Sequence, residues 1–381
     1  MQYDLTDDQR EIEEVARRFT ASDITPHAAH WDEHHVFPVD TIRAAAALGF
    51  GAIYVSEESG GIGLGRIEAA LIMEAMAYGC PSTSAFISIH NMASWMIDAF
   101  GSAELKARYL PKLVPMDLIA SYCLTEPGSG SDAAALRTRA TRDGDDYVVT
   151  GSKAFISGGG ANDVYVTMVR TGVDGHKGIT CLAIDKDMPG VSFGAPERKM
   201  GWHSQPTAQV NFDAVRVPVA NRVGDEGQGF AIAMQGLDGG RLNIGACSLG
   251  GAQRALDEAI AYTRGRSQFG KAIADFQATQ FKLADMETEL QAARTLLYAA
   301  AARVEANAPD KTKFAAMAKR LATDTGTSVV DRALQLHGGY GYLMDYPVER
   351  LFRDLRVHQI LEGTNEIMRV VIAREMLRAS N

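Results

Sequence analysis

The run Val164-Tyr165-Val166-Thr167-Met168-Val169 decides the fold class of this chain. Its β-branched and aromatic residues favour a strand over a helix. Similar short runs occupy residues 147–150, 179–184 and 209–212, and Gly, Asp and Pro separate them. We therefore predict a compact β-domain in the middle third of the chain.

Helical patterns flank this β-rich segment on both sides. Thr6 and Gln9 fit a capping box, and Ile12, Val15 and Phe19 then fall on one helical face. Further helices are expected at 39–49, 67–78, 84–100 and 103–114, the last interrupted by Pro111, and then at 228–265, 275–307, 311–337 and 364–378. Runs of helices set apart from runs of strands are typical of an α+β fold and not of a doubly wound sheet.

The length of 381 residues exceeds what one hydrophobic core usually organises. The changes of pattern divide the chain into three parts. We expect an N-terminal helical domain at 1–118, a middle β-domain at 119–226 and a C-terminal helical domain at 227–381.

Composition excludes several classes of protein. The net charge of −9 argues against a nucleic-acid binder, which needs a basic surface to displace phosphate counterions. The four cysteines are widely spaced and form no CxxC pair, so buried free thiols are expected instead of a zinc site or disulfides. No apolar run approaches the roughly 20 residues of a membrane helix, so no membrane association is expected.

The first residues, MQYDLTDDQREIEE, are acidic and show neither a signal peptide nor an Arg-rich transit pattern. This pattern indicates a cytoplasmic protein of bacterial type. A mature mitochondrial matrix form would look the same and stays open.

The motif YCLTEPGSGSD at 122–132 lies where helix gives way to strand. Its small residues let backbone N–H groups approach an anion, and Thr125, Ser129 and Ser131 offer hydroxyl donors. The loop could hold the edge of a flavin or a pyrophosphate, or it could be a tight turn alone. It is not the G-x-G-x-x-G dinucleotide fingerprint.

A second motif, HQILEGTNEIMR at 358–369, places Glu362 beside Gly363, just before a helix that Thr364 can cap. Ile360 and Leu361 precede the carboxylate. Apolar surroundings disfavour the charged form and raise a carboxyl pKa toward that of a useful general base. From this segment alone, however, a solvated loop carboxylate is the favoured interpretation.

The third motif is LDGGR at 237–241, with two glycines inside a helical stretch. Paired glycines cost a helix on the order of 1–2 kcal/mol, so something must approach the backbone closely, either a ligand or another helix. The segments RSQFG at 266–270 and QLHGGYG at 335–341 end two long helices and suit phosphate or ribityl contacts, although helix capping alone would explain their glycines. No Walker A loop, nucleophile elbow or metal-ligand spacing of histidines occurs.

Four motifs together resemble the acyl-CoA dehydrogenase family over essentially the whole chain. In chain order they are YCLTEPGSGSD, RSQFG, QLHGGYGY and ILEGTNEIMR. Four further stretches resemble the branch of this family that oxidises isobutyryl-CoA in valine degradation. They are SIHNMASWMIDAFG, GSKAFISGG, GWHSQPT and VPVANRVG. The resemblance implies a helical N-terminal domain, a β-barrel-like middle domain and a C-terminal four-helix bundle. It also implies a homotetramer that binds FAD.

The resemblance further implies the residues of the site. The cofactor would contact Tyr122, Leu124, Thr125, Gly130, Ser131, Phe155, Ile156, Ser157, Arg266, Phe269, Phe276, Gln277, Gln335, Leu336, His337, Gly338, Gly339, Thr364, Asn365 and Glu366. The acyl-CoA substrate would contact Ser131, Asp238, Gly239, Gly240, Arg241, Gly363 and Arg374. Some of the cofactor contacts would cross a subunit interface.

The chemistry that the resemblance implies is removal of the α-proton by Glu362 and transfer of the β-hydride to flavin N5. Electrons would then pass to an electron-transfer flavoprotein. Members with a relocated base carry Glu directly before the arginine that Arg241 matches, whereas this chain has Gly240 there. This difference favours Glu362 as the base.

The expected reaction is isobutyryl-CoA to methacrylyl-CoA. Preference for 2-methylbutyryl-CoA or butyryl-CoA is the main alternative. An acyl-CoA oxidase and a flavin-free binding protein also stay open.

Overall fold

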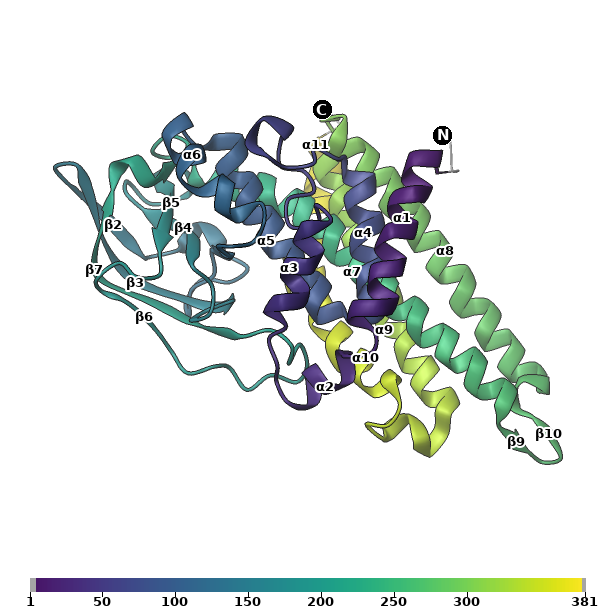
Figure 1. Cartoon of the computed structure of the whole chain (residues 1–381). Coiled ribbons are helices and arrows are strands. Elements are labelled where there is room, and N and C mark those ends of the chain that lie inside the picture. Colours follow the sequence, from purple (N-terminus) through teal and green to yellow (C-terminus); the bar gives the residue numbers. More distant parts are fainter. Residues whose placement is uncertain (1–4, 379–381) are drawn as a thin grey trace.

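The computed structural model describes residues 5–378, so the first four residues and residues 379–381 of the expected terminal domains lie outside it. Figure 1 shows a β-rich part at one end, long helices at the other and the N-terminal helices between them. The N-terminal region comprises α1 (Asp7–Phe19), the π-helix η1 (Thr20–Ile24), α2 (Ala28–Glu33), α3 (Val39–Ala47), α4 (Arg66–Gly79), α5 (Pro81–Phe100) and α6 (Ala103–Leu113).

The expected capping box at the start of α1 is confirmed. The Thr6 hydroxyl accepts from the Gln9 backbone, and the Gln9 side chain accepts from the Thr6 backbone. The interruption expected at Pro111 is wrong, because α6 continues through this residue to Leu113. A proline at this position costs the helix one backbone hydrogen bond, to the carbonyl four residues earlier, and this single loss did not end the helix.

The middle region is one eight-stranded sheet. Its strands are β1 (Ala120–Cys123), β2 (Arg139–Asp143), β3 (Asp146–Ser157), β4 (Val164–Arg170), β5 (Ile179–Asp185), β6 (Val191–Phe193), β7 (Thr207–Pro218) and β8 (Arg222–Val223). The order is β6-β7-β3-β2-β4-β5-β8, and β1 pairs in parallel with β4.

Strand β4 carries the apolar run that predicted this domain, and all seven of its residues are buried. Val166 and Met168 belong to a core shared with α5, α6 and the start of α7. Tyr165 and Val169 belong to the core inside the sheet. Because successive side chains of a strand point to opposite faces, burial of both faces requires the continuous apolar run.

The C-terminal region contains α7 (Gly229–Gly265), α8 (Gln277–Glu305), α9 (Lys311–His337), α10 (Pro347–Arg356) and α11 (Asn365–Arg378). A small hairpin of β9 (Ser267–Gln268) and β10 (Lys271–Ala272) joins α7 to α8. The long helices of this region agree with the expected ones to within two residues. In the N-terminal region α5 begins three residues earlier than expected, and the pattern missed α2 there and α10 here.

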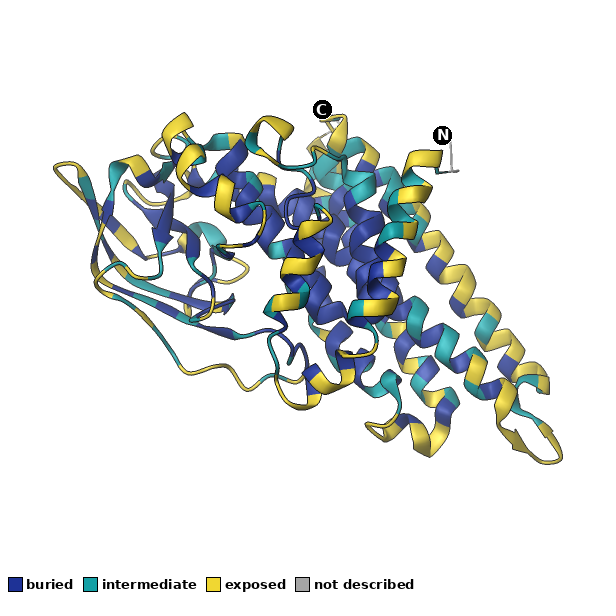
Figure 2. Ribbon diagram, in the orientation of Figure 1, coloured by how far each residue is buried: buried dark blue, intermediate teal, exposed yellow. Residues whose placement is uncertain are grey.

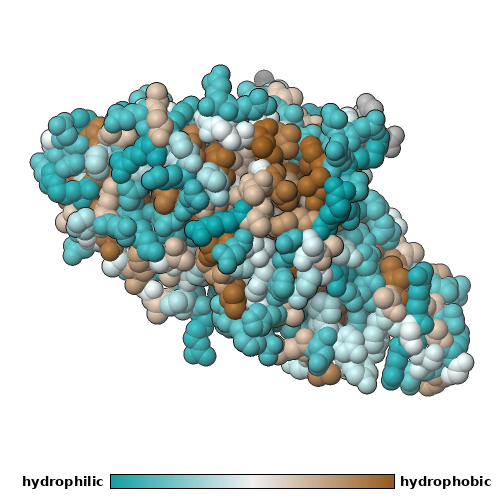
Figure 3. Space-filling model, viewed as in Figure 1, coloured by the Kyte–Doolittle hydropathy of each residue, from teal (hydrophilic) through white to brown (hydrophobic). Residues whose placement is uncertain are grey.

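Burial concentrates where the N-terminal helices meet α7, and Figure 2 shows this central zone in dark blue. On the face drawn in Figure 3, hydrophilic side chains cover both ends and a hydrophobic area lies between them. All four cysteines are buried and free, as expected. Within residues 5–378, none of the helices combines the length and the apolar character that a membrane crossing needs.

Helix α7 is rich in glycine because its neighbours approach its backbone closely. A Cβ added at Gly250 would lie 2.1 Å from the Glu74 carbonyl oxygen of α4. Real Cβ atoms do not come this close to backbone oxygen, so α4 and α7 would have to separate. The core between the N-terminal and C-terminal regions therefore depends on a missing side chain.

We predict that Gly250→Ala lowers the free energy of unfolding by about 1–3 kcal/mol or more, because the added methyl overpacks the crossing of two helix backbones. The midpoint of urea unfolding measures the loss. Gly265→Ala is the matched control, since a Cβ there meets nothing within 4 Å. Equal midpoints for the two variants would contradict the packing argument.

Candidate active site

Glu362 lies in the turn between the short helix η8 (Val357–Gln359) and α11. Its backbone is in the left-handed region, with a φ of 56°, and Gly363 follows with a φ of 88°. This turn directs the carboxylate at α7, where a Cβ on Gly240 would lie 2.6 Å from Glu362 Oε2. The second glycine of the LDGGR motif therefore makes room for the carboxylate.

The Glu362 carboxyl group is shielded from water even though the residue as a whole is only partly buried. Its Oε2 atom is buried and has no hydrogen-bond partner among the described residues. Burial raises the pKa of Glu362 to about 7, while the positive charges of Arg241 and Lys319 oppose the rise. The structure thus contradicts a solvated loop carboxylate, and a group with this pKa can act as a general base near neutral pH.

Arg241 and Asp238 are both buried and bind each other. The Arg241 Nη1 atom lies 2.7 Å from Asp238 Oδ1, and the Thr312 hydroxyl donates to the second carboxylate oxygen. Arg241 Nε also points to the backbone carbonyl of Glu362, at 3.4 Å. The pair fixes this part of α7 against the Glu362 turn.

Gly239, the first glycine of the pair, makes room for Arg66 of α4. A Cβ at Gly239 would lie 2.4 Å from Arg66 Nη1. The guanidinium lies 3.9 Å from the centre of the Tyr54 ring and 5.3 Å from that of Trp95, within the range of cation–π contacts. Sequence reasoning did not select Arg66 or Tyr54, because no local pattern signals that they meet α7.

Tyr122 is close enough to Glu362 for their charges to interact. Its hydroxyl is buried and has no hydrogen-bond partner among the described residues. Burial and the Glu362 carboxylate raise the pKa of Tyr122 well above its usual range. The phenol therefore stays neutral, and its orphaned hydroxyl suits a ligand that occupies this space.

The small-residue loop after β1 is held from inside by a buried ion pair. Lys153 Nζ lies 2.8 Å from Glu126 Oε1 and also donates to the Leu124 carbonyl. Glu126 accepts in addition from the backbones of Arg137 and Thr138. Sequence reasoning missed this pair, which keeps the loop rigid.

The outer side of the same loop is open. Gly128 and Gly130 have nothing within 4 Å of an added Cβ, and Ser131 is exposed. A rigid loop whose small residues face open space can accept a ligand against its backbone.

Phe155 projects from β3 beside this loop. It has a φ of 58° and is 68% exposed, although it is a large apolar residue. It lies at an irregularity of the β3–β7 pairing between Lys153 and Ile156, and its neighbour Ala154 donates to the Thr125 carbonyl. Such strain in an exposed aromatic residue is typical of a functional position. Ile156 is buried and Ser157 is partly buried.

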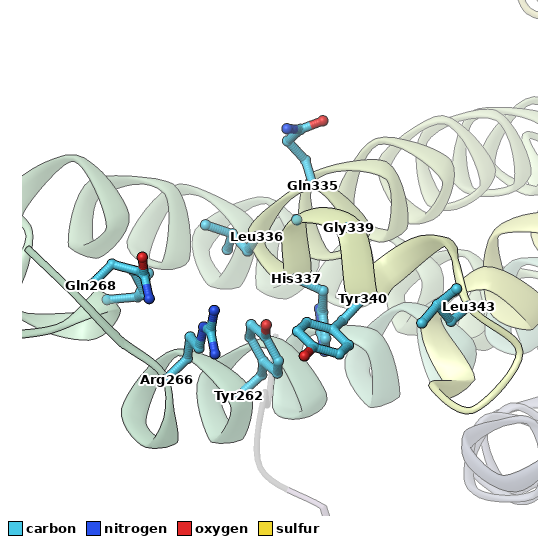
Figure 4. Close-up of a pocket in the computed structure, with 11 residues that line it drawn as sticks. Tyr262, Arg266, Gln268, Gln335, Leu336, His337, Gly339, Tyr340 and Leu343 are labelled. Atoms are coloured by element: carbon cyan, nitrogen blue, oxygen red, sulfur yellow. The ribbon is translucent and has the colours of Figure 1, made fainter.

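A second group of predicted residues lines a cavity of about 460 Å³. Figure 4 shows Tyr262 and Arg266 at the end of α7, facing His337 and Tyr340, with Gln335 pointing outward. The lining consists of Tyr262, Arg266, Gln268, Ile273, Gln335, Leu336, His337, Gly338, Gly339, Tyr340 and Leu343.

The contacts inside this cavity show which lining residues support its wall and which can bind a ligand. The His337 ring is buried and stacks on Tyr262 at 4.4 Å, so it supports the wall. Arg266 is exposed and forms no ion pair within residues 5–378, which suits an anionic ligand. On the nearby hairpin, Phe269 is 95% exposed and its ring lies 6.4 Å from that of Phe276. Gln277, the first residue of α8, is exposed.

The residues that follow Glu362 have different roles. Thr364 caps α11, as expected, by accepting from the Ile367 backbone. Asn365 is buried and binds Thr323 and Asp324, whereas Glu366 is exposed. A small polar hollow of about 170 Å³ adjoins them and is lined by Asp324, Arg356, Gln359, Ile360, Thr364, Asn365, Glu366 and Arg369. Arg374 lies farther along α11 and is exposed.

Three family models match the chain in sequence. Residues 6–117 match the acyl-CoA dehydrogenase N-terminal domain, residues 121–215 the middle domain and residues 227–377 the C-terminal domain.

Known proteins resemble the chain over nearly its whole length. Mitochondrial isobutyryl-CoA dehydrogenase of Dictyostelium discoideum is 55% identical, over 98% of this chain and 90% of that protein. Its Bos taurus counterpart is 53% identical with the same coverage. The structure of butyryl-CoA dehydrogenase from Megasphaera elsdenii superposes with a TM-score of 0.96 at 37% identity, over 99% of this chain and 100% of that one. An FAD complex of PigA superposes with a TM-score of 0.95 at 30% identity, over 99% of each chain.

We predict that Lys153→Met lowers the free energy of unfolding by about 3–5 kcal/mol, because Glu126 is left as a buried carboxylate without its cation. Urea unfolding measures the loss. Lys177→Met, at an exposed lysine of the same domain, is the control and should leave stability unchanged. Parental stability of Lys153→Met would show that the ion pair does not hold the loop.

Proposed function

The chain belongs to the acyl-CoA dehydrogenase family, and on that premise we propose that it dehydrogenates a short branched acyl-CoA, isobutyryl-CoA, to methacrylyl-CoA. The observation that carries the dehydrogenation is the Glu362 carboxyl group, which is buried against Gly240 with its pKa raised to about 7. The choice of isobutyryl-CoA is supported by the two isobutyryl-CoA dehydrogenases that are 55% and 53% identical to the chain. Two hydrogens leave the substrate, one as the α-proton and the other as the β-hydride. We also propose that the chain divides into an N-terminal domain at 1–118, a middle domain at 119–226 and a C-terminal domain at 227–381.

Glu362 is the base. Its Oε2 atom has no hydrogen-bond partner among the described residues, so no protein donor competes with the substrate α-proton. The negative charge that develops on the thioester oxygen needs hydrogen-bond donors, and we assign the backbone N–H of Glu362 to this role. The flanking charges of Arg241 and Lys319 keep part of the carboxyl population ionised at neutral pH.

The family and its FAD-containing structural neighbour support a flavin cofactor, and we propose FAD. A bound FAD would supply the acceptor for the hydride of the substrate β-carbon. The residues fit such a group, because the loop at 122–131 is open and rigid, the Tyr122 hydroxyl is unpartnered and Phe155 is exposed. We assign the flavin ring to these residues together with Ile156, Ser157 and Thr364 to Glu366.

The phosphates and adenosine of FAD require a separate set of residues. We assign them to Arg266, Phe269, Phe276, Gln277 and the segment 335–339. Of these, Arg266 and the segment 335–339 line the cavity of about 460 Å³. In Figure 1 the β-rich part and the β9–β10 hairpin lie at opposite ends of the molecule. A single copy therefore does not bring both sets together, and we propose a homotetramer in which one subunit completes the cofactor site of another.

The substrate contacts divide into exposed and buried groups. Ser131 and Arg374 are exposed and suit the polar CoA portion. Gly239 and Gly240 make room for Arg66 and for the Glu362 carboxylate, and we assign them, together with Gly363, to the wall that the acyl thioester contacts. Asp238 and Arg241 already bind each other, so we assign them to holding the wall of the acyl pocket. Electrons leave through an electron-transfer flavoprotein.

A butyryl-CoA preference is the second candidate, because the butyryl-CoA dehydrogenase structure superposes with a TM-score of 0.96. A 2-methylbutyryl-CoA preference differs from isobutyryl-CoA by one methylene, which is worth about 1–3 kcal/mol in a pocket. Anaerobic flavin bleaching with acyl-CoAs of three to six acyl carbons ranks these substrates. We expect isobutyryl-CoA to give the highest kcat/KM, and a tenfold advantage for butyryl-CoA would overturn the proposal.

The same preparation distinguishes two other functions. An acyl-CoA oxidase would form hydrogen peroxide in stoichiometric amounts without an added acceptor. A flavin-free binding protein would lack the yellow absorbance even after FAD is added. We expect neither result.

We predict that Glu362→Gln lowers the rate of flavin reduction by at least about 10²–10⁴-fold, because an amide of the same shape cannot accept the α-proton. Binding of FAD and acyl-CoA should persist. Stopped-flow absorbance measures the rate, and Glu14→Gln on the exposed face of α1 is the control. Near-parental reduction by Glu362→Gln would eliminate this residue as the base.

We also predict that flavin reduction becomes faster as the pH rises through about 7, the pKa of Glu362. The sign follows because only the ionised carboxylate accepts a proton, and burial has moved its formation upward from 4.5. Single-turnover rates between pH 5.5 and 8.5 test this dependence. A rate that is already maximal at pH 5.5 would contradict it.

A further inference from the structure

Lys319 of α9 is a fully buried lysine, with 0% exposure. Its Nζ atom donates to the Gly363 carbonyl at 2.8 Å and to Asn365 Oδ1 at 2.9 Å. Within residues 5–378 it forms no ion pair with a carboxylate, so neutral oxygen atoms satisfy the buried ammonium. Removing an ammonium from water without a direct counter-ion is costly, which suggests a specific use.

The two acceptors of Lys319 both belong to the turn that carries the base. Glu362 is a non-glycine residue in the left-handed region, a conformation that costs on the order of 1–2 kcal/mol and needs support from its surroundings. Arg241 approaches the carbonyl of Glu362, and Lys319 binds the carbonyl of the next residue. Asn365 is in turn held by Thr323. The turn is thus clamped from α7 on one side and from α9 on the other.

The charges around Glu362 come from several elements. Arg241 on α7 and Lys319 on α9 are the cations, and the Tyr122 and Tyr54 phenols face the same carboxyl group from β1 and from the segment before α4. Around Lys319, Asp324 and Glu366 favour its charged form, as Glu362 does. Burial lowers the pKa of Lys319 to about 8, so it is still a cation where Glu362 titrates.

We propose, on the basis of the function assigned above, that Lys319 is a positioning residue for the base: it holds the Glu362 turn through the Gly363 carbonyl and supplies a buried positive charge to the carboxylate. The role differs from that of a packing residue, because it needs both the hydrogen bond and the charge. Methionine has the length of lysine but provides neither. Glutamine keeps a donor without the charge.

The experiment measures the titration of Glu362 itself. Infrared difference spectra of the flavin-containing protein follow the carboxyl C=O band with pH, and its loss in Glu362→Gln assigns the band. We expect the midpoint to rise by about one pH unit or more in Lys319→Met and Lys319→Gln, because one of two nearby cations is gone. Thr323→Val, which alters the same hydrogen-bond network without changing charge, should keep the parental midpoint. Unchanged midpoints in both lysine variants would overturn the proposal.

Rates give a second readout that loss of structure alone would not produce. At pH 7 we expect Lys319→Gln to reduce flavin about tenfold more slowly than the parent, and above pH 9 to recover most of that loss. A loss that is equal at every pH would contradict the role of the charge. If Lys319→Met fails to fold, as judged by circular dichroism and flavin content, Lys319→Gln alone decides the outcome.

The titration separates this proposal from the proposed function. It needs no substrate, so a parent protein that no acyl-CoA reduces would refute the dehydrogenase function while the midpoints still report on Lys319. Conversely, active parent protein with unchanged midpoints in the lysine variants would refute the role of Lys319 alone.

Discussion

Close approach to the backbone of α7 is the constraint on which the rest of the structure depends. At Gly250 the helix α4 comes so near that a methyl group would meet its backbone oxygen. Nearer the start of the same helix, Gly239 makes room for the Arg66 guanidinium and Gly240 for the Glu362 carboxylate. The helix therefore joins the domains and forms the wall of the site through the same property, the absence of side chains.

Buried charge is the second organising feature, and each case holds a different part of the site. The pair of Lys153 and Glu126 fixes the loop after β1 from inside the sheet. Asp238 and Arg241 fix the wall of α7 beside the base. Such pairs contribute little net stability compared with apolar residues, but loss of one partner is costly. They therefore make the geometry sensitive to single substitutions.

Much of this arrangement was predictable from local patterns. Short-range rules predict the capping box of Thr6 and Gln9, the N-cap at Thr364 and the long helices, and the structure confirms them. The segment around Glu362 on its own favoured a solvated loop carboxylate, which is wrong, because burial raises the pKa of this group to about 7. Pro111 misled the prediction because the loss of one backbone hydrogen bond did not end the helix, which continues two residues farther to Leu113.

The sequence by itself determined the α+β order and the strand character of the β4 run, because propensity and periodicity act between residues close in the chain, whereas Glu362 as the candidate base followed from the family resemblance. The tertiary structure alone decided that Arg66 faces Gly239 and that Lys319 binds the Glu362 turn. These contacts join residues far apart in sequence, and desolvation depends on everything that surrounds a group. No local pattern contains that information, so the environment of the carboxylate emerged only with the fold.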